Sequence, residues 1–500
     1  GAGASSGMAM AHWEIQGWMI LILGWVFVPF YSRSMVYTMP EFLERRYNPQ
    51  SRTILSVISL VSYVLTKVAV TVYAGGLVFQ QVFGIKELWG IDFFWIAAIG
   101  LVVLTALYTI FGGMKSVLYT SVLQTPILLL GSLIILVLGF KELGGWDEMM
   151  RVCGAVTVND YGDTMTNLIR SNDDANFPWL GALIGSAIIG FWYWCTDQFI
   201  VQRVLSGKNE KEARRGTIFG AYLKLLPVFL FLIPGMIAFA LHQKYIGAGG
   251  EGFLPMLANG TANADAAFPT LVAKLLPAGV KGLVVCGILA ALMSSLASLF
   301  NSSAMLFTID FYKRFRPETP EKKLVGIGQI ATVVIVILGI LWIPIMRSVG
   351  DVLYTYLQDV QSVLAPGIAA AFLLGICWKR TSAQGGMWGL IAGMIIGLTR
   401  LGAKVYYSNA GEVADSTFKY LFYDMNWLFF CGWMFLFCII VVIVVSLATE
   451  APTAEKIQGL VFGTATKEQK AATRASWDHW DIIHTVIILA ITGAFYWYFW

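Results

Sequence analysis

The segment CGILAALMSSLASLFNSSAMLF, residues 286–307, is almost entirely apolar and yet carries a cluster of hydroxyl groups. About 20 apolar residues in a helix cross the ~30 Å hydrocarbon core of a bilayer, so this segment is predicted to span a membrane. In that core an unpaired polar atom costs free energy, and hydroxyls near mid-span therefore need partners. These hydroxyls belong to Ser294, Ser295, Ser298, Ser302 and Ser303.

Two interpretations of this serine cluster stay open from the segment alone. Serine hydroxyls together with freed backbone carbonyls can form the oxygen cage that a hard cation such as sodium requires. Alternatively, the hydroxyls bond back to carbonyls one turn earlier or line a contact between two helices. The rest of the chain favours the cation site.

Similar apolar segments recur along the whole chain of 500 residues. Hydrophobic residues make up 57% of it and charged residues only 13%, whereas ordinary soluble domains carry about 25% charge. The pattern predicts an all-α integral membrane protein with twelve complete spans. The predicted spans cover residues 12–31, 54–83, 93–111, 117–140, 179–205, 217–242, 280–312, 325–346, 354–378, 383–401, 427–447 and 480–500.

The distribution of basic residues tests these spans. If loops alternate between the two sides and the loop after the first span lies inside, 21 of the 34 Lys and Arg residues fall inside, 11 outside and two within spans. This asymmetry follows the positive-inside rule and places the C-terminus outside. We expect a multi-pass protein of the plasma membrane. The net charge of +4 follows from this topology and does not indicate a nucleic-acid partner.

The start of the chain, GAGASSGMAMA at residues 1–11, reads as the end of an earlier helix. We therefore expect an N-terminal helix and the first half of the first core helix to be missing from this sequence. No signal peptide is visible, and the longest polar stretches are loop-sized, so no appended soluble domain is expected. Whether the protein needs an accessory membrane subunit or forms a homodimer stays open.

Ionisable residues inside predicted spans are costly and indicate function by default. Glu14 lies early in the first span, Lys67 near the middle of the second, and Lys224 in a later one. The alternatives are an interfacial carboxylate for Glu14 and, for each lysine, a structural cation that holds backbone carbonyls. Asp197 either belongs to the same set or pairs only with Arg203.

The chemistry of this set suits a neutral polyol. A carboxylate accepts hydrogen bonds, an ammonium donates them, and the carboxamide of Gln358 does both. Each hydrogen bond between a charged and a neutral group contributes ~1.5–3 kcal/mol net, which suits selective but reversible binding. Tyr193 and Trp194 can lay a ring against a sugar and gate the site; without the polar set they would be read as packing aromatics.

A membrane enzyme would need a catalytic pair or a set of metal ligands. The four histidines lie near span ends, and no HExxH or similar spacing occurs. The sequence therefore predicts a transporter, with no cofactor other than a coupling ion. A passive channel for sugar or water is the alternative that the residues leave open.

Seven segments of the chain resemble the solute:sodium symporter family, and within it the sodium–glucose cotransporter branch. The likeness covers nearly the whole chain. The segments are YTMPEFLERRY (37–47), LYTIFGGMKSVLYTSVLQT (107–125), FWYWCTDQFIVQRVLSGKN (191–209), YLKLLPVFLFLIPGMIAF (222–239), AFPTLVAKLLPAGVKGLVV (267–285), LMSSLASLFNSSAMLFTIDFYKR (292–314) and GIAAAFLLGICWKR (367–380).

The resemblance implies a LeuT-type fold, a pair of inverted five-helix repeats with additional C-terminal helices. On this basis residues 1–406 form the transporter core, and residues 407–500 form the C-terminal helices and loops. The resemblance also implies roles for individual residues. Those expected to bind or enclose the sugar are Glu14, Lys224, Gln358, Tyr193 and Trp194, to which we add the intramembrane Lys67.

The sodium site of the family falls on the serine-rich segment. The resemblance implies that Ala291 contributes its carbonyl, and Ser294 and Ser295 their hydroxyls. Many relatives carry Asp where this chain has Ser121, and that Asp is associated with a second sodium ion. The neutral Ser121 therefore favours a single ion.

Together these observations predict a symporter that moves one sodium ion with one neutral hexose, similar to glucose or galactose, by alternating access. Its expected partners are the sugar, sodium and the lipid bilayer. A sodium/myo-inositol symporter and an uncoupled sugar facilitator are the alternatives.

Overall fold

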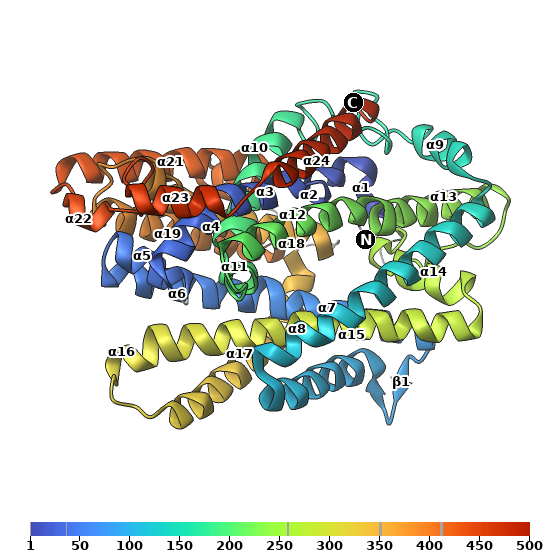
Figure 1. Ribbon diagram of the computed structural model, residues 1–500. Helices are drawn as coiled ribbons and strands as arrows, with labels where there is room; N and C mark the ends of the chain where they lie inside the picture. Colours follow the sequence, from blue (N-terminus) through green and yellow to red (C-terminus); the bar gives the residue numbers. More distant parts are fainter. Residues whose placement is uncertain (1, 37, 258–259, 350–352, 411–413) are drawn as a thin grey trace.

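Most long helices of the molecule run in roughly one direction, as expected for a bundle that crosses a bilayer (Figure 1). The computed structural model describes residues 2–36, 38–257, 260–349, 353–410 and 414–500. It describes their side chains except those at 108, 110–118, 120, 121, 123 and 346–349.

The first part of the chain contains the helices of the first spans and a two-stranded hairpin; elements marked η are 3-10 helices (η1, η6) or π-helices. These elements are α1 (Ala2–Ser6), η1 (Gly7–Met10), α2 (Ala11–Glu14), α3 (Gly17–Ile22), η2 (Leu23–Phe27), α4 (Val28–Ser34), α5 (Met39–Arg46), α6 (Pro49–Ser62), η3 (Tyr63–Val68), α7 (Ala69–Phe83), β1 (Glu87–Leu88), β2 (Ile91–Asp92) and α8 (Phe93–Leu143).

The middle part is helical as well. Its elements are α9 (Trp146–Gly154), α10 (Trp179–Gly190), η4 (Phe191–Thr196), α11 (Gln198–Leu205), α12 (Glu210–Pro227), η5 (Val228–Leu232), α13 (Ile233–Gly247), η6 (Ala264–Ala266), α14 (Ala267–Leu275), α15 (Ala278–Met305), η7 (Leu306–Tyr312) and α16 (Lys313–Phe315).

The last part completes the bundle. Its elements are α17 (Glu321–Val349), α18 (Leu353–Cys377), α19 (Ala383–Asn409), α20 (Thr417–Lys419), η8 (Tyr420–Asp424), α21 (Trp427–Ala448), α22 (Ala454–Ile457), α23 (Lys467–Ala475) and α24 (His479–Tyr498). We call the end with α5, α16 and α22 the basic end, and the end with α9 and the β1–β2 hairpin the opposite end (Figure 1).

Within the described residues, eleven helical segments are long and apolar enough to cross a membrane. Eleven of the twelve predicted spans lie on these segments, and the twelfth falls on the shorter apolar stretch Phe93–Leu107 at the start of α8. The expectation of a multi-pass all-α membrane protein is confirmed.

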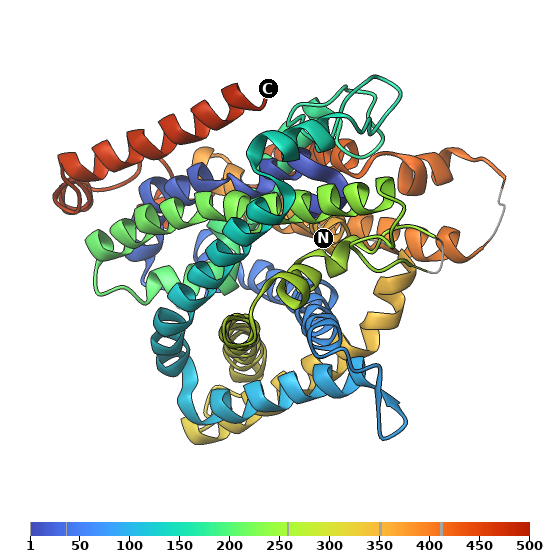
Figure 2. The same ribbon diagram turned by 90° about the vertical axis from the view of Figure 1, so that its right-hand side faces the viewer.

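One detail of the prediction is wrong. Residues 112–116, expected as a loop between two spans, are helical, so both spans lie on the 51-residue α8. A straight helix of this length would extend ~77 Å, more than twice the ~30 Å hydrocarbon core. Figure 2 shows that α8 instead changes direction along its course.

Side chains fix where several helices begin. Asn48 accepts a hydrogen bond from the Ser51 backbone N–H at 2.8 Å, directly before Pro49 in the first position of α6. Asp92 accepts one from the Phe94 N–H at 3.0 Å at the start of α8. Such caps satisfy N–H groups that the first turn of a helix leaves without partners.

The buried helix α18 lies at the centre of the packing, against α10, α19 and α21. It crosses α19 where Gly367 faces Gly393, since a Cβ atom on Gly393 would lie only 2.6 Å from the Gly367 Cα atom. Small residues allow this close approach in a membrane, where helix association depends on packing.

The predicted boundary at 406/407 falls inside α19, near its end at Asn409. The helices beyond it pack directly on the core: α21 lies against α10, α18 and α19, and α24 lies against α3 and α12. Residues 407–500 are thus in contact with the helices that carry the candidate site.

Candidate functional site

The first span is interrupted at the level of Glu14. The helix α2 ends at Glu14, the backbone leaves helical geometry at Ile15 and Gln16, and α3 begins at Gly17. Two further candidate residues lie on π-helical turns, Lys67 on η3 and Tyr193 on η4. Interrupted helices and π turns are frequent at functional sites because they release backbone groups and redirect side chains.

Glu14 lies between two partners from distant parts of the chain. Lys224 Nζ on α12 donates to Glu14 Oε2 at 2.8 Å, and Tyr354 on α18 donates its hydroxyl to Glu14 Oε1. The Lys224 ammonium also lies 5.5 Å from the centre of the Trp194 ring. Three helices thus meet at one carboxylate, which is paired inside the helix bundle.

This carboxylate faces a cavity of about 220 Å³, which we call the central cavity. Five of the six predicted sugar-site residues line it, namely Glu14, Tyr193, Trp194, Lys224 and Gln358. They come from four separate segments of the chain. The remaining lining residues are Trp13, Gln16, Ile189, Gly190, Tyr354, Leu357 and Gln361.

Gln358 has unused bonding capacity inside the central cavity. Its Oε1 atom is buried and accepts no hydrogen bond within the described part of the chain. A buried acceptor without a partner carries a desolvation cost of ~1–3 kcal/mol that a bound donor removes. This acceptor is therefore available to a ligand with hydroxyl groups.

Four polar or aromatic lining residues were missed by the sequence analysis: Trp13, Gln16, Tyr354 and Gln361. Helical spacing could have found two of them, since Tyr354 and Gln361 lie four residues before and three after Gln358 and share its face of α18. Gln16 follows Glu14 across the helix break, so no helical periodicity relates the two.

A second cavity of about 280 Å³ adjoins the first and shares Glu14, Tyr354 and Leu357 with it. Most of its other lining residues are apolar, from α7, α14 and η5, with Asp265 as an exception. Asp265 accepts a hydrogen bond from the Leu353 N–H at 2.9 Å, and burial raises the pKa of its carboxyl group. The bond between Tyr354 and Glu14 therefore lies where the two cavities meet.

The sixth predicted residue, Lys67, does not line the central cavity. Its ammonium donates to the Asp197 carboxylate and lies 4.4 Å from the centre of the Phe199 ring and 5.1 Å from that of Tyr193. Tyr63 donates to the other Asp197 oxygen at 3.0 Å. Lys67 thus pairs with a carboxylate rather than with backbone carbonyls, and Asp197 does not pair with Arg203.

The serine cluster is divided between two environments on α15. Ser298 and Ser302 accept hydrogen bonds from α11, the first from Arg203 and the second from Gln202 at 2.6 Å. Ser302 also donates to the Ser298 carbonyl at 2.9 Å, one turn earlier. For Ser302 the helix-packing interpretation is therefore correct. We call the following set of residues the inner network: Tyr63, Lys67, Asp197, Gln202, Arg203, Ser298 and Ser302.

The predicted sodium ligands lie on the same helix, one to two turns from Ser298. Ser294 is buried, and Ala291 and Ser295 are partly exposed. Hydroxyl and carbonyl oxygens at this spacing are the donor types that sodium accepts, so the residues fit one wall of such a site. The side chain of Ser121, on which the stoichiometry prediction depends, lies outside the described residues.

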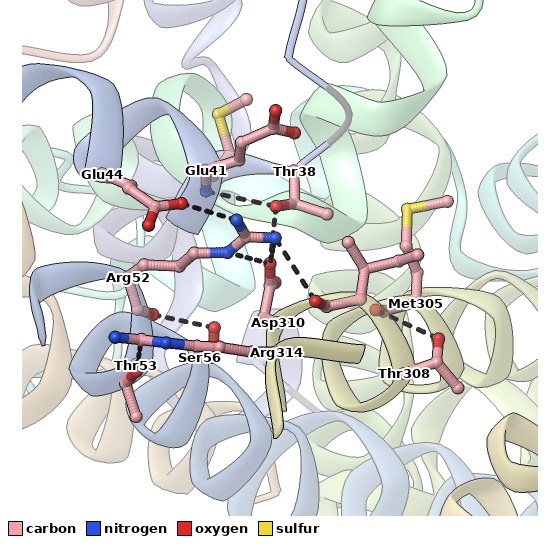
Figure 3. A network of polar contacts seen from close by, with 12 residues as sticks. Thr38, Glu41, Glu44, Arg52, Thr53, Ser56, Met305, Thr308, Asp310 and Arg314 are labelled. Carbon is pink, nitrogen blue, oxygen red and sulfur yellow. Dashed lines mark hydrogen bonds and ion pairs between the residues drawn. The ribbon is translucent and has the colours of Figure 1, made fainter. Parts of the chain in front are cut away.

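A further polar network ties helices together at the basic end (Figure 3). Arg52 on α6 pairs with Asp310 on η7 at 2.7 Å and with Glu44 on α5 at 2.6 Å. Thr38, which caps α5, donates to Asp310 at 3.2 Å. This network joins α5 to the ends of two spans and lies apart from the residues of the central cavity.

Comparison with known proteins identifies the family. The model of the sodium:solute symporter family matches residues 1–393. Human sodium/myo-inositol cotransporter 2 is 35% identical over 477 residues, which cover 93% of this chain and 70% of the relative. The bovine sodium/mannose cotransporter SLC5A10 is 36% identical over 504 residues, 96% of this chain and 83% of the relative. Zebrafish sodium/glucose cotransporter 4 is 34% identical over 495 residues, which cover 95% of this chain and 74% of the relative.

Among solved structures, a Na⁺-coupled sialic acid symporter in a substrate-bound outward-open state superposes with a TM-score of 0.67. It is 21% identical, and the match covers 90% of this chain and 86% of the other. At this identity the likeness concerns the fold alone, and it confirms the LeuT-type architecture. The chain therefore belongs to the sodium:solute symporter family and is a sodium-coupled transporter of a small solute, not an enzyme.

Proposed function

We propose that this protein couples the inward movement of one sodium ion to the uptake of a neutral hexose similar to glucose or galactose. The observation that carries the proposal is the central cavity, in which Glu14, Lys224 and Gln358 converge from three distant helices. A carboxylate, an ammonium and a carboxamide together offer acceptors and donors to a ring with several hydroxyl groups. A carboxylate substrate is disfavoured because Glu14 would repel it.

The aromatic residues complete this site. Tyr193 and Trp194 line the same cavity, and Trp194 already receives the Lys224 ammonium on its ring. In the proposed cycle Tyr193 closes the inner side of the site, and Tyr354 covers its other side from the junction with the second cavity. Lys67 acts one step away, through Asp197 and the ring of Tyr193.

Sodium is assigned to Ala291, Ser294 and Ser295 on α15. The ion would stabilise the state in which the sugar site is accessible from outside, and the sugar would then favour an occluded state. A ligand can shift such an equilibrium only by its difference in affinity for the two states. Coupling therefore requires that bound sodium raise the affinity for the sugar, and that a carrier loaded with only one of the two rarely change sides.

One sodium ion supplies enough energy for accumulation. Its movement across ~100 mV contributes about 2.3 kcal/mol, and a tenfold concentration gradient adds about 1.4 kcal/mol. The sum supports accumulation of the sugar by several hundred-fold, and a second ion would square that ratio. The neutral Ser121 supports a single ion.

A second candidate substrate is myo-inositol, another neutral ring polyol that the same groups would bind. The relatives named above support it as directly as they support a hexose, because they are named as cotransporters of myo-inositol, mannose and glucose.

For location we propose the plasma membrane, with the basic end of the bundle inside and the C-terminus outside. Site-directed labelling of a cysteine placed after Trp500 tests this orientation.

Uptake by the purified protein in liposomes tests the function. Radiolabelled glucose and myo-inositol are offered separately, with an inward sodium gradient and with potassium in place of sodium. We expect sodium to drive one of them above its equilibrium distribution, with a higher sodium requirement in the Ser295→Ala variant. Uptake that only equilibrates, with no sodium effect, would overturn coupling and leave a facilitator.

A further inference from the structure

Gln16 occupies an unusual place in the central cavity, at the break between α2 and α3. Its backbone lies outside the helical region, at φ −77° and ψ 29°, so its side chain is not held on the face of either short helix. The residue is only 2% exposed and nevertheless lines the central cavity. A carboxamide buried in this position requires hydrogen-bond partners, because burying it without them costs free energy.

One half of this carboxamide is fixed by the neighbouring helix. Gln16 Nε2 donates to the backbone carbonyl of Ser186 on α10 at 2.8 Å. This bond determines the orientation of the amide group and directs the other atom, Oε1, away from that carbonyl. Within the described residues, Oε1 accepts no hydrogen bond.

The free oxygen lies beside a glycine that makes room for it. A Cβ atom on Gly190 would lie 2.6 Å from Gln16 Oε1 and 3.0 Å from its Cδ atom. Any side chain at position 190 would therefore displace the carboxamide from its place. Gln16 and Gly190 are a matched pair across two helices, and Gly190 itself lines the cavity.

The other polar groups of the cavity leave this oxygen a distinct role. Both Glu14 oxygens already accept hydrogen bonds, one from Lys224 and one from Tyr354. Among the described carboxamide oxygens that line the cavity, those of Gln16, Gln358 and Gln361 accept no hydrogen bond, and that of Gln358 is fully buried. A ligand that satisfies them must donate, and hydroxyl groups are the donors that a neutral ring polyol carries.

We propose that Gln16 determines substrate specificity by accepting a hydrogen bond from one particular hydroxyl of the transported ring, in the space that Gly190 leaves open. The inference rests on the proposed polyol site and deepens it. It implies that the protein discriminates against analogues that lack this hydroxyl or carry it as a methyl ether. Such analogues bind more weakly because they leave this acceptor without a partner in the ligand-filled cavity.

A merely structural role for Gln16, as a tether between α2 and α10, makes a different prediction. A tether would affect all ligands equally, whereas a specificity residue affects only those that carry the hydroxyl in question. The two roles are separated by a panel of ligands that differ by single hydroxyl groups, and not by any single substrate.

The test measures binding of myo-inositol, glucose and their monodeoxy analogues to the purified protein in sodium. Quenching of tryptophan fluorescence provides the signal, because Trp13 and Trp194 line the cavity. The variants are Gln16→Met, which keeps the length of the side chain and removes both polar atoms, and Gly190→Ala, which displaces the amide. Ser186→Ala on α10 is the matched control, because its backbone carbonyl is retained.

We expect one monodeoxy analogue to bind the natural protein about 3- to 10-fold more weakly than the parent, as the loss of one hydrogen bond implies. The Gln16→Met and Gly190→Ala variants should bind the unmodified polyol only as tightly as the natural protein binds that analogue. Their affinity for the analogue itself should change little. Such non-additivity identifies a direct contact. Ser186→Ala should leave the whole panel unchanged.

Equal weakening of all ligands by Gln16→Met, or no weakening, would overturn the inference. Where Gln16→Met does not fold, Gly190→Ala replaces it, because this substitution displaces the amide and must give the same pattern of affinities. If the natural protein binds no polyol, the proposed function and the inference both fail. If polyols bind with this pattern but sodium drives no uptake, only the proposed coupling fails.

Discussion

The central cavity and the inner network are both polar clusters inside membrane-spanning helices, yet they use their polar atoms differently. In the inner network the Lys67 ammonium faces the Asp197 carboxylate, and the hydroxyls of Ser298 and Ser302 accept side-chain donors. Arg203 Nε is the side-chain atom of this network that is buried without a partner among the described residues. In the central cavity Gln358 retains a buried oxygen without a partner in the described part of the chain. The space beside it is large enough for a ligand.

This difference shows how intramembrane polar residues can be sorted into structural and ligand-binding ones. A cluster whose groups satisfy one another holds helices together, and removing one member exposes the rest to an apolar environment. A cluster with unused capacity beside a cavity gains its last partners from a ligand. Mutations in the first should therefore change stability, and mutations in the second should change affinity.

The largest expected effect concerns the inner network. The Asp197→Ala variant leaves the Lys67 ammonium buried without its counter-charge, which should lower the free energy of unfolding by about 3–5 kcal/mol. Thermal unfolding in detergent, followed by circular dichroism, measures the loss. The double variant that also carries Lys67→Met should recover most of it. A single variant as stable as the natural protein would show that the ion pair does not hold these helices.

Glu14→Gln should mainly affect transport. It removes the charge from a group that binds Lys224 and is proposed to bind sugar, so one charge-assisted hydrogen bond is weakened. The loss of such a hydrogen bond, at ~1.5–3 kcal/mol, corresponds to a rise in KM for the sugar of about 10- to 150-fold. Initial rates of uptake at several sugar concentrations measure this KM. Glu148→Gln is the matched control, because Glu148 pairs with Arg151 on α9, away from the cavity. An unchanged KM would remove Glu14 from the sugar site.

Two serines on α15 sharpen the comparison within one helix. Ser295→Ala should raise the sodium concentration for half-maximal uptake about tenfold, because a hydroxyl ligand is lost. Ser302→Ala should leave the sodium dependence unchanged and lower stability by about 1 kcal/mol, because the Gln202 amide loses its acceptor at 2.6 Å and keeps only the Ser298 carbonyl at 3.4 Å. Sodium titrations of uptake and thermal unfolding of both variants measure these effects. Equal effects of the two substitutions on sodium dependence would contradict the division of the serine cluster.

The smallest effect is expected for Gln358→Leu. Because Oε1 of Gln358 has no partner within the described part of the chain, its removal should not lower stability and should raise KM only about 3- to 10-fold. Uptake kinetics and thermal unfolding of the same preparation measure both quantities. A marked loss of stability would mean that Gln358 belongs to the structural class.

Much of this arrangement could be predicted from the sequence, for a physical reason. Spans are set by hydrophobic length, and a charged residue within a span is rare enough to attract attention. Glu14 and Lys224 could therefore be singled out, and the structure brings them together. The resemblance to a family then pointed to Tyr193 and Gln358, which line the same cavity. The residues that were missed are those for which neither length nor charge gives a signal.

Gln16 and Lys67 show which features of the site could not be predicted from the sequence. The role of Gln16 depends on a break in the helix and on an absent side chain at Gly190, 174 positions away in the sequence. Lys67 carries the expected charge, but its pairing with Asp197 depends on the π-helical turns η3 and η4, which redirect side chains without altering the hydrophobic pattern. The helical path through residues 112–116 was missed for a similar reason, since GGMKS favours a loop by composition.

The central claim is that sodium drives a neutral ring polyol through the central cavity. The most direct measurement is the steady-state accumulation of radiolabelled glucose or myo-inositol in liposomes that hold the natural protein or the Glu14→Gln variant, with sodium and with potassium outside. We predict accumulation well above equilibrium for the natural protein in sodium only, and little for Glu14→Gln at the same substrate concentration. Accumulation that does not depend on sodium, or that Glu14→Gln leaves intact, would contradict the account.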